Sequence, residues 1–125
     1  MDENELSYKI IGAALKVHTA LGPGLLESVY ETVLAHELKK LGLDVKTQIA
    51  IPFIFEDFKF DCGFQLDILV NDKVIIELKS VEELSDVHHK QLLTYLKLSN
   101  KKLGLLINFN VSHLKEDIIR IVNKL

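Results

Sequence analysis

The stretch FQLDILVNDKVIIELK, residues 64–79, consists of two apolar segments joined by three polar residues. Asn71-Asp72-Lys73 is typical of a tight turn, so the stretch predicts a β-hairpin. Asp67, Glu77 and Lys79 are the charged residues inside the two apolar segments. Because burying charge in a hydrophobic strand is costly unless it is compensated, these three side chains are the first candidates for a functional site.

The predicted hairpin would bring these charges together. Side chains alternate between the two faces of a strand, so Glu77 and Lys79 share a face and Leu78 takes the other. Nine residues lie between Asp67 and Glu77, enough for a hairpin to bring them level. Two carboxylates can hold a hard divalent cation such as Mg²⁺, and a lysine beside it can activate water or stabilise a phosphate. The alternative is an ordinary salt bridge at a strand end, although the apolar flanks favour a central strand.

Composition indicates a globular protein that forms one domain over residues 1–125. Hydrophobic residues make up 48% of the chain and charged residues 26%. The longest apolar run, Ile49 to Phe55, contains a proline and is too short to span a bilayer. Cys62 is the only cysteine, which excludes an internal disulfide and a cysteine-based zinc site. No signal-peptide core follows the acidic first residues, so we expect a cytoplasmic location.

The charge balance limits how nucleic acid could be bound. The net charge is −3 and Arg120 is the only arginine, which counts against a large basic footprint. A nuclease is still compatible with this balance, because active-site carboxylates add negative charge that a metal neutralises. Contacts to DNA or RNA would therefore depend on lysines and backbone amides.

Periodicity, breakers and caps predict the other elements of the chain. In order they are helices at 4–21 and 25–41, strands at 45–56 and 58–62, the hairpin, a helix at 86–98, a strand at 103–109 and a helix at 112–123. Ser85 and Ser112 are the expected caps of the last two helices. This order predicts a mixed sheet flanked by helices, in which strand 103–109 joins in parallel after a crossover.

Three further side chains are candidates for the site. Glu27, in the first turn of the second helix, is either a third carboxylate of the site or a favourable partner of the helix dipole. Gln91 and Tyr95 are four residues apart and share a face of the third helix. An amide and a phenol can hydrogen-bond a phosphate, but the pair could equally be a surface glutamine and a half-buried tyrosine.

Several segments together resemble one known family. Residues 24–30, Gly-Leu-Leu-Glu-Ser-Val-Tyr, match the signature of the GxxExxY family, a group of small bacterial and archaeal proteins in the PD-(D/E)XK nuclease superfamily. The resemblance runs from residues 14–18 through Glu77-Leu78-Lys79 and 91–96 to 104–109, and so covers nearly the whole chain. Leu66 stands where the superfamily's eponymous proline would precede Asp67.

The resemblance implies a restriction-endonuclease-like αβββαβ core with a central mixed sheet flanked by helices. It implies that Asp67 and Glu77 bind Mg²⁺ or Mn²⁺, with the backbone carbonyl of Leu78 as a further ligand. Lys79 would position or deprotonate the attacking water, and Glu27 would be the helix-borne acidic residue of the superfamily.

Gln91 and Tyr95 resemble the Q-xxx-Y element found in the exonuclease branch of the same superfamily. The expected function is hydrolysis of phosphodiester bonds of nucleic acid by a metal-dependent nuclease, with DNA favoured over RNA and no membrane partner. Two alternatives stay open: a branched-DNA resolvase that acts as a homodimer, and a binding module for nucleic acid or a protein partner that retains the fold without catalysis.

Overall fold

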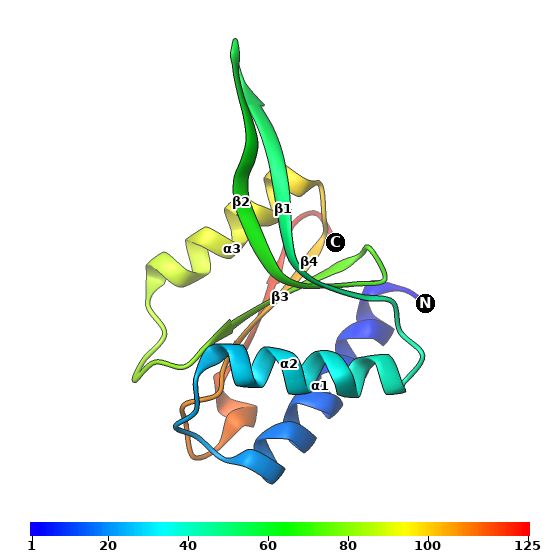
Figure 1. Cartoon of the computed structure of the whole chain (residues 1–125), viewed down its shortest axis with the longest axis vertical. Coiled ribbons are helices and arrows are strands. Elements are labelled where there is room, and N and C mark those ends of the chain that lie inside the picture. The colour runs from blue at the N-terminus through cyan, green and yellow to red at the C-terminus, as the bar shows by residue number, and fades with distance from the viewer.

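A computed structural model describes residues 1–125, in which helices pack on both faces of a five-stranded sheet (Figure 1). The elements are α1 (Glu3–Leu21), α2 (Glu27–Lys40), β1 (Val45–Phe55), β2 (Phe58–Val70), β3 (Val74–Lys79), α3 (Asp86–Ser99), β4 (Leu103–Asn108), the 3₁₀ helix η1 (Leu114–Asp117) and β5 (Ile118–Val122). The strand order is β1-β2-β3-β4-β5, with β3 and β4 parallel and the other neighbours antiparallel. The mixed sheet and the parallel strand after α3 confirm the expectation from the sequence.

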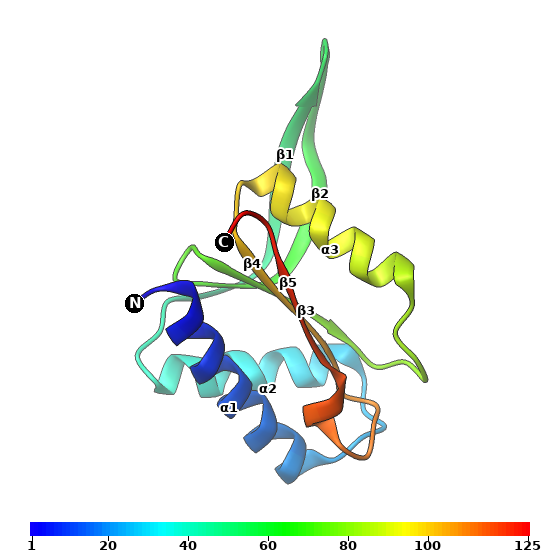
Figure 2. The same ribbon diagram turned by 180° about the vertical axis from the view of Figure 1, so that it is seen from behind.

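Two hydrophobic cores lie on opposite faces of the sheet. The larger contains 19 buried residues and joins α1 and α2 to one face, and the smaller contains seven and joins α3 to the other. Figure 2 shows α3 on the opposite side of the strands from α1 and α2. In β3, Ile76 and Leu78 belong to the larger core and Ile75 to the smaller one. This central position explains why β3 is almost continuously apolar in sequence.

The β1–β2 hairpin extends well beyond the rest of the sheet (Figures 1 and 2). β2 pairs with β3 only from Val70 to Ile68, whereas its pairing with β1 continues to the turn at Phe55↔Phe58. Segments 58–62 and 64–70, which the sequence indicated as separate strands, are therefore one continuous strand. The two strands separate from β3 beyond Ile68, and the candidate site lies at this separation.

The helix termini follow from local sequence. The side chain of Asp2 accepts a hydrogen bond from the backbone N–H of Glu5 at 2.8 Å and caps α1. In α3, Ser85 and His88 form a capping box in which His88 Nδ1 accepts from the backbone N–H of Ser85. No helix combines the length and the apolar character that crossing a membrane requires.

The prediction of a final helix at 112–123 is wrong. Only residues 114–117 form a helical turn, and 118–122 form β5, which pairs antiparallel with β4. Four of the five residues of β5 are β-branched, and such side chains favour a strand over a helix. Ile118 packs against the larger core, while Ile119 and Ile121 pack against the smaller one, so both faces of this edge strand gain contacts. Ser112 caps no helix; residue 113 precedes η1 without a side-chain cap.

Candidate active site

Two carboxylates occupy the fork at which β2 separates from β3. The last residue pair between these strands is Ile68↔Ile76, so Asp67 and Glu77 are the next positions along each strand. The backbone N–H of Asp67 donates to Glu77 Oε1 at 3.2 Å, and the backbone N–H of Leu78 donates to Asp67 Oδ2 at 2.8 Å. Each side chain thus hydrogen-bonds the backbone of the opposite strand where the ladder has ended. The hairpin brings the two carboxylates together, as their spacing predicted.

The fork is electrostatically unbalanced. Glu77 is only 6% exposed, and burial followed by the negative charge of Asp67 raises the pKa of Glu77 to about 8. Lys79, on the same face of β3, lowers the pKa of Glu77 in part. Neither carboxylate belongs to any of the ion pairs in the structure. Two neighbouring acidic groups without an ion-pair partner favour the binding of a cation.

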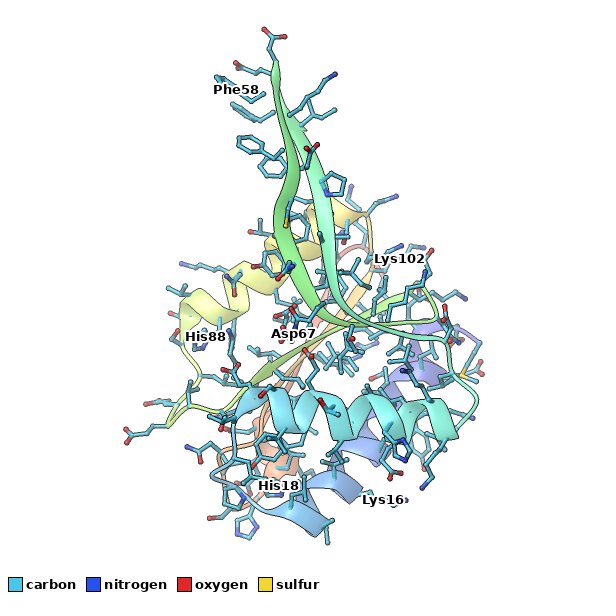
Figure 3. All side chains as sticks on the ribbon, in the orientation of Figure 1. Lys16, His18, Phe58, Asp67, His88 and Lys102 are labelled. Carbon is cyan, nitrogen blue, oxygen red and sulfur yellow. The ribbon has the colours of Figure 1, made fainter.

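A pocket of about 330 Å³ opens beside the fork. It is lined by Glu27, Ser28, Glu31, Gln48, Asp67 and Leu78. The first turns of α2 therefore bring Glu27, which is exposed, to the same pocket as Asp67. Figure 3 shows Asp67 at the base of the β1–β2 hairpin, on the side of α2. A larger hollow of about 550 Å³ along α1 contains no pair of carboxylates and is not the candidate site.

The turn before α2 is fixed by Tyr30. Its hydroxyl donates to the carbonyl of Gly22 at 2.6 Å and accepts from the backbone N–H of Leu25 at 3.1 Å, while its ring stacks on Phe109 with centroids 4.4 Å apart. Ser80 Oγ donates to the carbonyl of Leu25 at 2.7 Å. The Ser80 bond joins the turn to the residue after β3, so the start of α2 is held against the strand that carries Glu77 and Lys79.

The two candidate side chains on α3, Tyr95 and Gln91, differ in their surroundings. The ring of Tyr95 stacks on Phe64 at 4.5 Å, and burial, then the charges of Glu77 and Asp67, raise the pKa of Tyr95. The phenol therefore lies within the electrostatic field of the fork. Gln91 is exposed, one turn earlier, and its side chain forms no hydrogen bond.

Glu31 and Gln48 lie at the site although the sequence reasoning did not select them. Gln48 Nε2 donates to Glu31 Oε1 at 2.6 Å and is 3.5 Å from Asp67 Oδ1. A signal for Glu31 was present, because it lies one helical turn after Glu27 and shares its face. Gln48 had no such signal, since its position depends on how β1 pairs with β2.

The donors of the fork suit a hard cation. No group of three or more histidine, cysteine, aspartate or glutamate side chains is arranged to hold a metal ion. Asp67 and Glu77 nevertheless offer carboxylate oxygens, and the backbone offers carbonyl oxygens. Mg²⁺ is commonly bound through one or two carboxylates while it keeps several water ligands, so an oxygen-only set of this size is compatible with it.

Comparison with known protein families identifies the superfamily of the chain. The family model described as the PD-(D/E)XK nuclease superfamily matches residues 4–121. No curated protein and no solved structure matches the chain significantly. The succession α2, β1, β2, β3, α3, β4 is consistent with the αβββαβ core of a restriction-endonuclease-like fold. The chain belongs to the PD-(D/E)XK nuclease superfamily.

Proposed function

We propose that the protein is a metal-dependent nuclease that hydrolyses phosphodiester bonds of nucleic acid, with DNA as the favoured substrate. Membership of the superfamily supports nuclease activity. The observation that carries the proposal is the fork, where Asp67 and Glu77 face one another across separating strands without an ion-pair partner. Such a pair of carboxylates is suited to hold a divalent cation against a phosphate.

The proposed roles of the fork residues follow from their chemistry. Asp67, Glu77 and the backbone carbonyl of Leu78 would hold Mg²⁺ or Mn²⁺. The cation, when bound, would neutralise charge that develops on the phosphate and increase the acidity of water. Lys79 lies on the Glu77 face of β3, where its ammonium can orient water and stabilise a phosphate oxygen.

The helices would complete the site around the substrate. Glu27 presents an exposed carboxylate in the pocket beside Asp67 and would orient water or a ligand of the cation. The phenol of Tyr95 and the amide of Gln91 would hydrogen-bond the phosphate backbone without changing the charge of the site. Burial, then the charges of Glu77 and Asp67, raise the pKa of the Tyr95 phenol, whereas Gln91 is exposed, so the role of Tyr95 is the better supported of the two.

The structure offers a reason for each fixed residue of a GxxExxY motif, which supports the narrower assignment to that family. Gly24 has a φ of +97°, a conformation that glycine adopts without strain. Glu27 lines the pocket, and Tyr30 fixes the turn that places it there. Gly24 and Tyr30 therefore shape the turn that places the carboxylate of Glu27 in the pocket beside the fork.

A cleavage assay tests the proposal. Wild-type protein, Asp67→Asn and Lys79→Ala are incubated with Mg²⁺ or Mn²⁺ and with single-stranded, duplex and four-way-junction DNA and with RNA. We expect the wild type to cleave DNA and both variants to lose at least 100-fold in rate, because Asp67→Asn removes a charged ligand of the cation and Lys79→Ala removes the ammonium that would act on the phosphate. Lys124→Ala, an exposed lysine at the chain end, is the control for purification and should match the wild type.

The outcomes distinguish the alternatives. Cleavage that persists in Asp67→Asn and Lys79→Ala would refute the assignment of the site. If the wild type binds DNA or RNA but neither it nor any variant cleaves them, a non-catalytic binding module would be supported instead. Symmetric cutting of the four-way junction, together with a dimeric mass in solution, would favour the resolvase.

A further inference from the structure

Gln48 has an unusual backbone for a residue in the middle of a strand. Its φ is +50°, in the left-handed region that non-glycine residues adopt only at a cost. The flanking pairs Thr47↔Ile68 and Ile49↔Leu66 are in one register, so Gln48 stands opposite Asp67. The positive φ of Gln48 is therefore not accompanied by a shift in strand register at this position. Strain that persists without a local structural need is a reason to look for a role of the side chain.

The side chain of Gln48 links two carboxylates from different elements. Its Nε2 donates to Glu31 Oε1 of α2 at 2.6 Å and lies 3.5 Å from Asp67 Oδ1 of β2, at the outer limit of a hydrogen bond. The other oxygen of Asp67 accepts from the backbone N–H of Leu78. Both oxygens of Asp67 are thus approached by donors, one from β3 and one from β1, which fixes the plane of the carboxylate.

An amide suits this position better than a cation would. Lysine or arginine between Glu31 and Asp67 would cancel negative charge that a divalent metal requires. An amide donates hydrogen bonds to both carboxylates and remains neutral, so the charge of Asp67 is kept. The side-chain oxygen of Gln48, Oε1, accepts no hydrogen bond from the protein and is free to accept one from water.

We propose that Gln48 is a positioning residue, anchored by Glu31, which orients the Asp67 carboxylate and so sets the affinity of the fork for a divalent cation. This inference rests on the proposed function of the fork. Groups that orient metal ligands typically contribute 10- to 100-fold to metal affinity, so the loss of Gln48 should be measurable without any substrate.

Gln48→Gly separates this role from a structural one. Glycine adopts the left-handed conformation readily, so the thermal midpoint measured in chelator should be unchanged or higher than that of the wild type. The affinity for Mg²⁺, measured by titration calorimetry, should fall about tenfold or more. Glu31→Ala should weaken Mg²⁺ binding as well, and Glu31→Gln, which keeps the accepting oxygen, should weaken it less.

The double variant Gln48→Gly/Glu31→Ala tests whether the two residues act as one unit. If Glu31 acts through Gln48, the double variant should bind Mg²⁺ no more weakly than the weaker of the two single variants. Losses that multiply would overturn the proposed anchoring.

Glu56→Gly is the matched control. Glu56 also has a positive φ, +52°, but lies exposed at the turn between β1 and β2. Its replacement relieves the same kind of strain away from the fork and should leave the Mg²⁺ affinity unchanged. Wild-type affinity in Gln48→Gly, or equal losses of stability and affinity, would overturn this inference and leave the nuclease proposal intact. Failure of the wild type itself to bind Mg²⁺ or Mn²⁺ would overturn both.

Discussion

Glu77 shows at the residue scale how the fork couples stability to pH. Burial, then the charge of Asp67, raises its pKa from 4.5 to about 8. Between these values the unfolded chain releases the proton while the folded protein keeps it, so the folded state binds more protons. The contribution of Glu77 to stability therefore falls as the pH rises through this window. In chelator, we expect the titration of Glu77 to lower the free energy of unfolding by about 1 kcal/mol for each unit of rising pH.

Glu77→Gln isolates this contribution. Glutamine has nearly the same shape and carries no proton to lose, so the variant should lack this part of the pH dependence. Urea unfolding of both proteins from pH 5 to pH 8.5 in chelator gives the comparison. We expect the variant to become the more stable protein toward pH 8, and parallel curves for the two proteins would contradict the raised pKa.

Tyr30 is the second residue whose role can be isolated. Tyr30→Phe keeps the ring on Phe109 but removes the hydrogen bonds to Gly22 and Leu25. Since a typical hydrogen bond contributes about 1 kcal/mol, we expect a loss of about 2 kcal/mol in urea unfolding. Tyr8→Phe is the control, because Tyr8 is 83% exposed and should tolerate the change. Equal effects of both substitutions would exclude the proposed role of the Tyr30 hydroxyl.

At the scale of elements, the sequence predicted the helices and strands that are determined locally. The Gly22-Pro23-Gly24 break, the Ser85 cap and the turn at 71–73 each lie where the structure has them. The last segment was predicted wrongly because Ser112 and the apolar spacing after it fit a helix. Residues 118–122 form a strand because the edge of β4 is available for pairing, and sequence spacing does not reveal a free sheet edge.

The contact between α3 and β4 gives a prediction at the same scale. A Cβ atom on Gly104 would lie 2.9 Å from Leu92 Cγ, so glycine allows the helix to approach the strand closely. Because Leu92 is buried, Gly104→Ala should destabilise the protein by about 1–3 kcal/mol through overpacking. A Cβ on Gly12, in α1, would meet nothing within 4 Å, and Gly12→Ala should stabilise the helix by up to about 1 kcal/mol. Thermal unfolding of both variants tests this opposite pair, and equal signs would contradict it.

For the whole molecule, the sequence predicted those parts of the candidate site that a hairpin or a helix turn brings together. Asp67 and Glu77 meet within one hairpin, so spacing was sufficient. Gln48 reaches Asp67 only through the pairing of β1 with β2, and Glu31 reaches Gln48 only because α2 packs beside β1. Contacts among three elements depend on the assembled fold, which local patterns do not encode.

The fork exists only when β2 and β3 are paired within the folded sheet, so a cation that binds there should stabilise the whole fold. Mg²⁺ at 100 times its Kd would add about 2.7 kcal/mol and raise Tm by several degrees. The cation competes with the proton on Glu77, so at one fixed Mg²⁺ concentration the increase in Tm should be larger at pH 8.5 than at pH 6. Asp67→Asn, measured by differential scanning calorimetry under the same conditions, should show no increase at either pH. A shift in the variant equal to that of the wild type would mean that the cation binds elsewhere, whereas a pH-dependent shift in the wild type alone would link the ion, the buried carboxyl and the fold in one equilibrium.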